Sequence, residues 1–254
     1  MFQAGFSRLD VTPPLGAELS GYFHIRYAKG VLDPIYLNTL ALQDDKTTVI
    51  LMALDFIGIR LPFIKKLKQR ISKRTGVPED NVIIAALHQH TSCRIDQGSL
   101  SDLTDETYKD VLFRKMEDGA VMAIEDLAEA KLFSGEKETA EPISFVRRYV
   151  SDEGEVLTNP RTSIYKIVKR CGEADNTVRL LRFAREEKKD IVLLNFSTPI
   201  FLQRGRKNEL FKIQGRLLAK HLDLALQLRV YSGLSGALQL QYQHQSHHRN
   251  LRRG

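Results

Sequence analysis

The sequence predicts an α/β protein with a mixed sheet, in which a βαβ core is extended by β-hairpins and followed by a poorly structured C-terminal tail. Two strand-sized apolar runs, at residues 49–54 and 81–87, flank residues 62–75, where apolar side chains recur at helical spacing. A strand, a helix and a strand in close succession form a βαβ unit, so the two strands are expected to lie parallel and adjacent. Pairs of β-rich runs joined by polar turns predict the hairpins.

The other elements follow from periodicity and from turn residues. Residues 2–13 begin with an alternation typical of a strand and lead into a Pro-Pro-x-Gly loop. The helix at 62–75 starts with Pro62 and is followed by Gly76, and an apolar stripe predicts a long helix at 105–130. Hairpins are predicted at 36–42 with 47–54, at 145–150 with 156–157, and at 178–183 with 191–196.

The composition is that of a globular protein, with 43% hydrophobic and 27% charged residues among 254. It excludes a wholly disordered, collagen-like or coiled-coil chain, and no apolar run approaches the ~20 residues of a membrane helix. Cys93 and Cys171 are too few for a disulfide scaffold and have no CxxC partner, so both are expected to be idle free thiols. The N-terminal residues do not have the pattern of a signal peptide, which makes the cytoplasm the default location.

The net charge of +7 comes from the C-terminal tail. Residues 199–254 carry ten Lys and Arg against two acids, a balance of +8 that leaves −1 for residues 1–198. One interpretation is therefore a non-enzymatic binding module with a basic nucleic-acid-binding tail. The tail has only four aromatic residues and no RNA-recognition or zinc-finger pattern, so no nucleic-acid partner is expected. Residues 231–248 have the pattern of neither a strand nor a helix.

His88 and His90 are the candidate metal ligands, because they follow directly on a buried strand of the predicted sheet. Ligands in such sheets bind beyond the carboxyl ends of the strands, and residues two apart in an extended segment point the same way. Zinc accepts two imidazoles in this arrangement. The alternative is a pair of surface histidines in a polar loop.

Asp55 and Arg148 are the other candidate site residues. Asp55 ends the neighbouring parallel strand, where it could orient an imidazole or bind the metal itself, or instead cap the following turn. Arg148 follows Arg147 in a strand and is the candidate for binding a carboxylate or hydroxyl-rich substrate, although paired arginines are also typical of a solvated strand edge.

Several motifs resemble the N-terminal catalytic region of the neutral/alkaline non-lysosomal ceramidase superfamily, in its bacterial ceramidase-like branch. Its Ala-Thr-His-Thr-His-Ser-Gly pattern corresponds here to Ala-Leu-His-Gln-His-Thr-Ser at residues 86–92. The resemblance extends over residues 4–198, with further matching stretches at 4–16, 21–22, 30–36, 54–55, 75–78, 147–149, 158–160 and 181–183.

This resemblance implies a zinc hydrolase that cleaves an amide bond of a small-molecule or lipid-like substrate with metal-activated water. The family takes one metal ligand from the His-x-His segment, a second from Asn-Phe-x-x-His, and a Glu and a Tyr from later segments. At the second position this chain reads Asn-Phe-Ser-Thr-Pro over residues 195–199, without the histidine. The resemblance therefore implies a truncated chain, which is expected to be inactive.

The tail suggests a reason for the missing ligands. Reading part of it in a shifted frame gives a segment that resembles the family's Gln-Gly-x-x-Gly-Asp-x-Asn motif, which indicates a frameshift near Thr198. The predicted organisation is then an incomplete catalytic region at 1–198 and a basic, Gln-rich segment in a non-native frame at 199–254. The alternatives are a divergent lineage-specific tail and an intact metal-dependent hydrolase of another ester or amide that recruits other ligands, such as Asp55 and His24.

Overall fold

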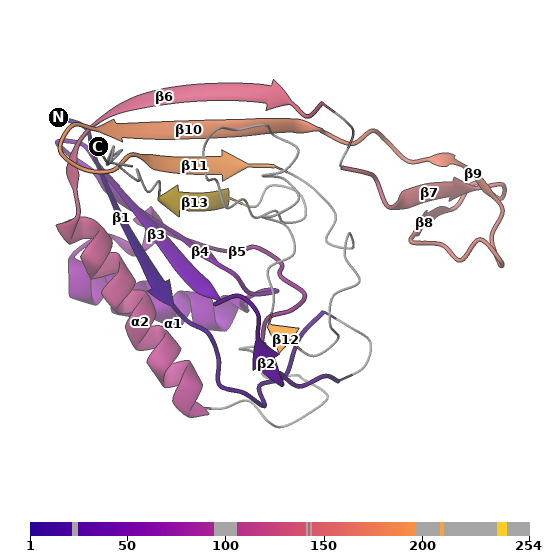
Figure 1. Ribbon diagram of the computed structural model, residues 1–254, viewed down its shortest axis with the longest axis horizontal. Coiled ribbons are helices and arrows are strands. Elements are labelled where there is room, and N and C mark those ends of the chain that lie inside the picture. The colour runs from indigo at the N-terminus through magenta and orange to yellow at the C-terminus, as the bar shows by residue number, and fades with distance from the viewer. Residues whose placement is uncertain are drawn as a thin grey trace, which may run out of the picture.

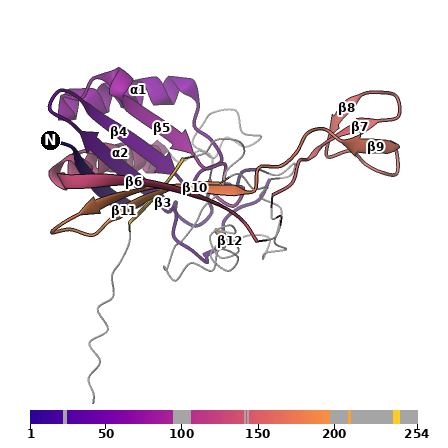
Figure 2. The same ribbon diagram turned by 90° about the horizontal axis from the view of Figure 1, so that it is seen from above.

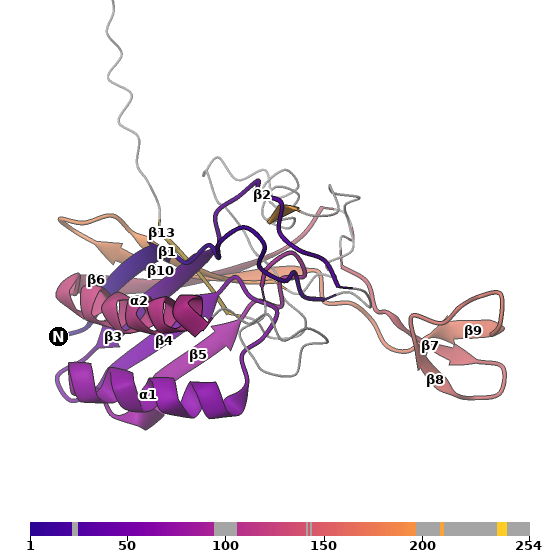
Figure 3. The ribbon, with the colours of Figure 1, turned by 90° about the horizontal axis from the view of Figure 1, so that it is seen from below.

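Two helices cover one face of a mixed sheet in the computed structural model, which describes residues 1–21, 25–93, 106–140, 142, 144–196, 209–210 and 238–242 (Figure 1). Helices α1 (Leu61–Thr75) and α2 (Glu106–Glu125) lie side by side on that face (Figure 3). The sheet has the strand order β13-β11-β10-β6-β1-β3-β4-β5. Its strands are β1 (Gln3–Asp10), β3 (Tyr36–Gln43), β4 (Thr48–Leu54), β5 (Val82–Ala86), β6 (Ala128–Glu138), β10 (Thr177–Arg185), β11 (Ile191–Asn195) and β13 (Leu238–Tyr242).

The predicted βαβ unit is confirmed. Strand β4 pairs with β5 in parallel, and α1 crosses between them on the helical face of the sheet. Pro62 lies in the first turn of α1, where its missing N–H needs no partner. Gly76 ends the helix with φ of 75°, and its N–H donates to the Ser72 carbonyl. A 3₁₀ turn at Glu79–Asn81 then leads into β5.

The sheet bends where β1 meets β6, because only Gln3 and Ala4 pair with β6. The half made of β6, β10, β11 and β13 folds over the face of β1, β3 and β4 that points away from the helices (Figure 2). Two apolar cores result. One lies between the helices and the sheet, and includes Ile50, Met52, Leu54, Leu67, Ile71, Leu112 and Met116. The other lies between the two half-sheets, and includes Ala4, Phe6, Leu40, Phe183, Ile191 and Leu193.

All three predicted hairpins are present, as β3–β4, β7–β8 and β10–β11. Strands β7 (Arg148–Ser151), β8 (Val156–Thr158) and β9 (Ile167–Arg170) form a separate sheet of three strands, which projects from the body (Figures 1 and 2). Strand β9 has no counterpart among the elements predicted from the sequence, and its residues are mostly exposed.

The chain after α2 differs from the prediction. The helix ends at Glu125, and residues 128–138 form β6 instead of a continued helix. Long-range pairing with β10 decides this, since the register runs from Thr177 opposite Glu138 to Arg185 opposite Ala130. No helix in the part of the chain that the structure describes is long and apolar enough to cross a membrane.

The tail contributes two short strands. Strand β12 (Glu209–Leu210) pairs with β2 (Gly30–Val31), and β13 pairs with β11 at the edge of the large sheet. The expectation that no part of residues 231–248 has a strand pattern is wrong for β13. Its sequence Leu-Gln-Leu-Gln-Tyr alternates with period two, which places Leu238, Leu240 and Tyr242 opposite Asn195, Leu193 and Ile191.

Candidate functional site: a histidine pair at the carboxyl ends of two parallel strands

The β4–β5 pair places Asp55 and the histidine segment at the same end of the sheet, as the sequence predicts. Leu54 lies opposite Ala86, so Asp55 and Leu87 both follow directly on their strands. The pairing continues past the strand ends, since the Leu87 N–H donates to the Leu54 carbonyl at 2.9 Å. The Gln89 N–H likewise donates to the carbonyl of Phe56 at 3.0 Å, which fixes the segment that carries the histidines.

The rings of His88 and His90 lie next to each other, with centroids 4.7 Å apart and ring planes at 75°. Nδ1 of His88 is 2.9 Å from the Ile57 carbonyl oxygen, and Nδ1 of His90 is 2.8 Å from that of Gly21. A carbonyl only accepts hydrogen bonds, so Nδ1 carries a proton in each ring, and Nε2 is the atom that a neutral ring leaves open. This is the state in which an imidazole binds a metal through Nε2.

The backbone between the two rings is not extended, contrary to the argument from residue spacing. His88 has φ of 56°, in the left-handed region that few residues other than glycine adopt. The chain turns at this residue, and the turn rather than an extended i, i+2 relation brings the two rings together. Strained backbone of this kind is concentrated at functional sites.

Burial lowers the pKa of His90 below its ordinary value, and the nearby charges of His88, Arg147 and Arg26 lower it further. The hydrogen bond to the Gly21 carbonyl acts in the opposite direction without reversing the shift. Arg26 is itself buried and donates from Nη2 to the His90 carbonyl at 3.1 Å. His90 is therefore neutral at pH 7, as metal binding requires.

Asp55 is fully buried and bonds to the neighbouring strand. Its Oδ2 accepts from the Tyr36 N–H at 2.9 Å, and its own N–H donates to the Tyr36 carbonyl at 3.1 Å. These bonds close the end of the β3–β4 pair, and the acceptor that orients His88 is the carbonyl of Ile57. A role of Asp55 toward the histidines stays a prediction.

The charge of Arg147 reaches His90, whereas substrate binding by Arg148 stays a prediction. Arg148 is the exposed first residue of β7 and pairs with Thr158 in the projecting sheet. Arg147 and Arg26 act on His90 and are not among the site residues predicted from the sequence. Neighbouring strand residues point to opposite sides, so only one of Arg147 and Arg148 can face the site, and the sequence does not show which one. Arg26 has no motif around it that would mark it as a site residue. His24 and residues 197–199 lie outside the described residues.

The histidine pair falls short of a complete metal site. Among the residues that the structure describes, no group of three or more His, Cys, Asp and Glu side chains could hold a metal ion. Two imidazoles can supply at most two ligands, and a catalytic zinc keeps three protein ligands. The described residues therefore supply at most two of the three protein ligands that a catalytic zinc needs.

Cys93 lies just past the histidine segment and is a buried free thiol. Burial raises the pKa of Cys93 to about 12 against the effect of a hydrogen bond with Tyr108, so almost no thiolate forms near pH 8. We expect a thiol reagent at pH 8 to modify the half-buried Cys171 quickly and Cys93 only after denaturation. A Cys171→Ser variant should give almost no reaction in the native state, and a fast reaction of that variant would contradict the placement of Cys93.

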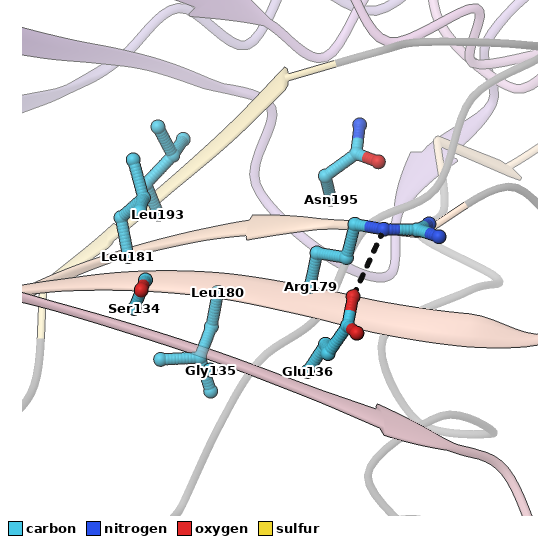
Figure 4. A pocket seen from close by; sticks show the side chains of 8 residues that line it. All are labelled: Ser134, Gly135, Glu136, Arg179, Leu180, Leu181, Leu193 and Asn195. Atoms are coloured by element: carbon cyan, nitrogen blue, oxygen red, sulfur yellow. Dashed lines mark ion pairs between the residues drawn. The ribbon is translucent and has the colours of Figure 1, made fainter.

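A separate pocket of about 580 Å³ lies on β6, β10 and β11, which do not carry the histidines (Figure 4). Leu181, Leu193 and Asn195 point to the same side of this sheet in the close-up view. The Arg179 guanidinium lies 3.5 Å from the Glu136 carboxylate at the same pocket.

No family model and no curated protein matches the chain. The chain does match solved structures. One is a ceramidase complexed with C2, with a TM-score of 0.56 and 19% identity over 73% of this chain and 29% of that one. Another is the neutral ceramidase from Pseudomonas aeruginosa, with a TM-score of 0.55 and 18% identity over 74% of this chain and 30% of that one. The chain thus spans less than a third of the length of either protein. Its fold is that of a portion of a ceramidase, which confirms at the level of the fold the resemblance predicted from its motifs.

Proposed function

We propose that the chain is a portion of a zinc-dependent amidohydrolase that resembles neutral ceramidase and acts on a small-molecule or lipid-like amide. One observation carries the proposal. His88 and His90 lie ring against ring past the ends of two parallel strands, and each is held through Nδ1 by a backbone carbonyl. Carbonyl-held imidazoles are typical of metal ligands, and the fold likeness to ceramidases supports the same reading.

His88 and His90 would hold the metal through their Nε2 atoms. A bound zinc ion lowers the pKa of its water to about 7 and polarises the carbonyl that is attacked. The carbonyls of Ile57 and Gly21 keep both imidazoles in the tautomer that binds. The guanidinium groups of Arg26 and Arg147 supply positive charge beside His90, which favours a substrate oxygen that gains negative charge.

The incomplete ligand set predicts weak zinc binding and no appreciable amidase activity for this polypeptide. We expect well under one zinc per chain after dialysis, and no hydrolysis of an N-acyl amide above the rate without protein. The tail contains His221, His244, His247 and His248, so a variant with these four changed to alanine gives the background from tail binding. In that variant, His88→Ala should remove the remaining weak zinc binding. Stoichiometric zinc that survives dialysis would contradict the proposal.

We also propose that residues 1–198 are an incomplete catalytic region and that the reading frame changes near Thr198. The motif resemblance ends there, and the segment 195–199 has proline where the family has its second metal histidine. The nucleotide sequence around this codon tests the idea directly. A shifted frame that continues the family's motifs supports it, whereas a shifted frame that soon reaches a stop codon excludes it.

A further inference from the structure

The chain that follows β1 runs against the histidine segment. Leu19 and Cys93 form an isolated antiparallel bridge, and the Ser20 N–H donates to the Ser92 carbonyl at 2.9 Å. The next residue, Gly21, is the one whose carbonyl meets the His90 ring. These backbone contacts hold Gly21 at a fixed place beside the ring.

Gly21 leaves no room for a side chain. It has φ of +92°, and an added Cβ would lie 2.5 Å from both Cγ and Nδ1 of His90. Carbon and nitrogen atoms that are not bonded do not approach this closely, so the ring occupies the space where any other residue would have its side chain. Two independent requirements, the backbone conformation and the contact with the ring, therefore call for glycine at this position.

We propose that Gly21 is a positioning residue that sets both the orientation and the tautomer of His90. Its carbonyl accepts a hydrogen bond from Nδ1, and its missing side chain lets the ring lie close against the backbone. The ring then presents Nε2 on the side away from Gly21. The effect of Gly21 on metal binding rests on the proposed function. Its effect on the tautomer of His90 is independent of that function.

The substitution Gly21→Ala should displace the ring and break the hydrogen bond from Nδ1. Without that bond the proton is no longer tied to Nδ1, so the Nε2–H tautomer gains population. Gly16→Ala is the matched control, because Gly16 lies in the same loop with φ of +87° and would place its Cβ in open space. Both variants carry the backbone strain of a positive φ, and only Gly21→Ala disturbs the ring.

The test is ¹⁵N–¹H NMR of the imidazoles in the zinc-free full chain at fixed pH, with His90 assigned through a His90→Gln variant. We expect wild type and Gly16→Ala to show the Nδ1–H tautomer of His90, and Gly21→Ala to show a mixture. Zinc affinity, measured in the variant without tail histidines, should fall about 10-fold to 100-fold in Gly21→Ala only.

Two results would overturn the proposal. One is an Nε2–H tautomer of His90 in the wild-type protein, which needs no variant to fold. The other is a Gly21→Ala protein that folds and keeps the wild-type His90 resonances. If wild type shows the Nδ1–H tautomer but binds no zinc at His88 and His90, the proposed function fails while the role of Gly21 stands.

Discussion

Replacing Gly5 with alanine is expected to lower the free energy of unfolding by about 3 kcal/mol or more. Gly5 lies in β1 where the strand crosses the end of α2. A Cβ there would lie 2.0 Å from the Ala123 carbonyl oxygen and 2.7 Å from the Leu127 nitrogen. Both are backbone atoms that cannot rotate away, so the strand and the helix must separate and the core between them must loosen.

Urea unfolding followed by circular dichroism measures this effect. Gly135→Ala is the control, because Gly135 is also a strand residue and its added Cβ would meet only the Leu180 side chain at 3.8 Å. We expect that variant to unfold within about 1 kcal/mol of wild type. A Gly5→Ala protein as stable as the control would show that β1 and α2 do not pack as closely as described.

Replacing Arg185 with methionine should cost about 1.5–3 kcal/mol, because it removes the buried, charged donor of hydrogen bonds to the partly exposed Asp126 carboxylate and to backbone carbonyls. The Arg185 side chain is fully buried, and its Nη1 donates to the Asp126 carboxylate at 2.7 Å. It also donates from Nε to the Lys189 carbonyl at 2.9 Å, so it ties the end of α2 to the β10–β11 turn. Arg179→Met is the matched control in the same strand, since the ion pair of Arg179 with Asp175 is exposed and worth about 0–1 kcal/mol.

The same ion pair gives the stability of the protein an acid dependence. Burial alone raises the pKa of Asp126, but hydrogen bonds from Arg185 and Lys188 outweigh it and bring that pKa below its usual value. A carboxyl whose pKa is lower in the folded state stabilises the fold above its unfolded pKa of about 3.9, and this contribution is lost as the pH falls through the folded pKa. In Asp126→Asn this part of the acid dependence should be absent. An unchanged acid dependence in that variant would contradict the role of Asp126.

The sequence patterns predicted those helices and strands whose conformation is determined by their own residues. The parallel pair β4–β5 follows from its apolar runs, and α1 follows from its periodicity with Pro62 and Gly76 at its ends. Strand β6 could not be found in this way. Most residues of β6 are exposed, and several of them are charged. Its conformation depends on pairing with β10, which lies about 50 residues further along the chain.

The site was predictable to a similar degree. The position of His88 and His90 follows from the strand that precedes them and from the rule that sites lie at the carboxyl ends of parallel strands. The residues that orient the rings could not be predicted, because Ile57 and Gly21 act through backbone carbonyls, which no side-chain motif records. A glycine whose side-chain position is filled by another ring becomes visible only when the loop after β1 and the segment after β5 are seen together.

The central claim is that His88 and His90 are the metal-binding groups of this chain. Histidine-selective ¹⁵N labelling followed by zinc titration tests it at each of the seven imidazoles. We expect the Nε2 resonances of His88 and His90 to shift together on adding zinc, and to keep shifting when the tail histidines are replaced by alanine. Zinc that shifts only the tail resonances, and leaves those of His88 and His90 in place, would contradict it.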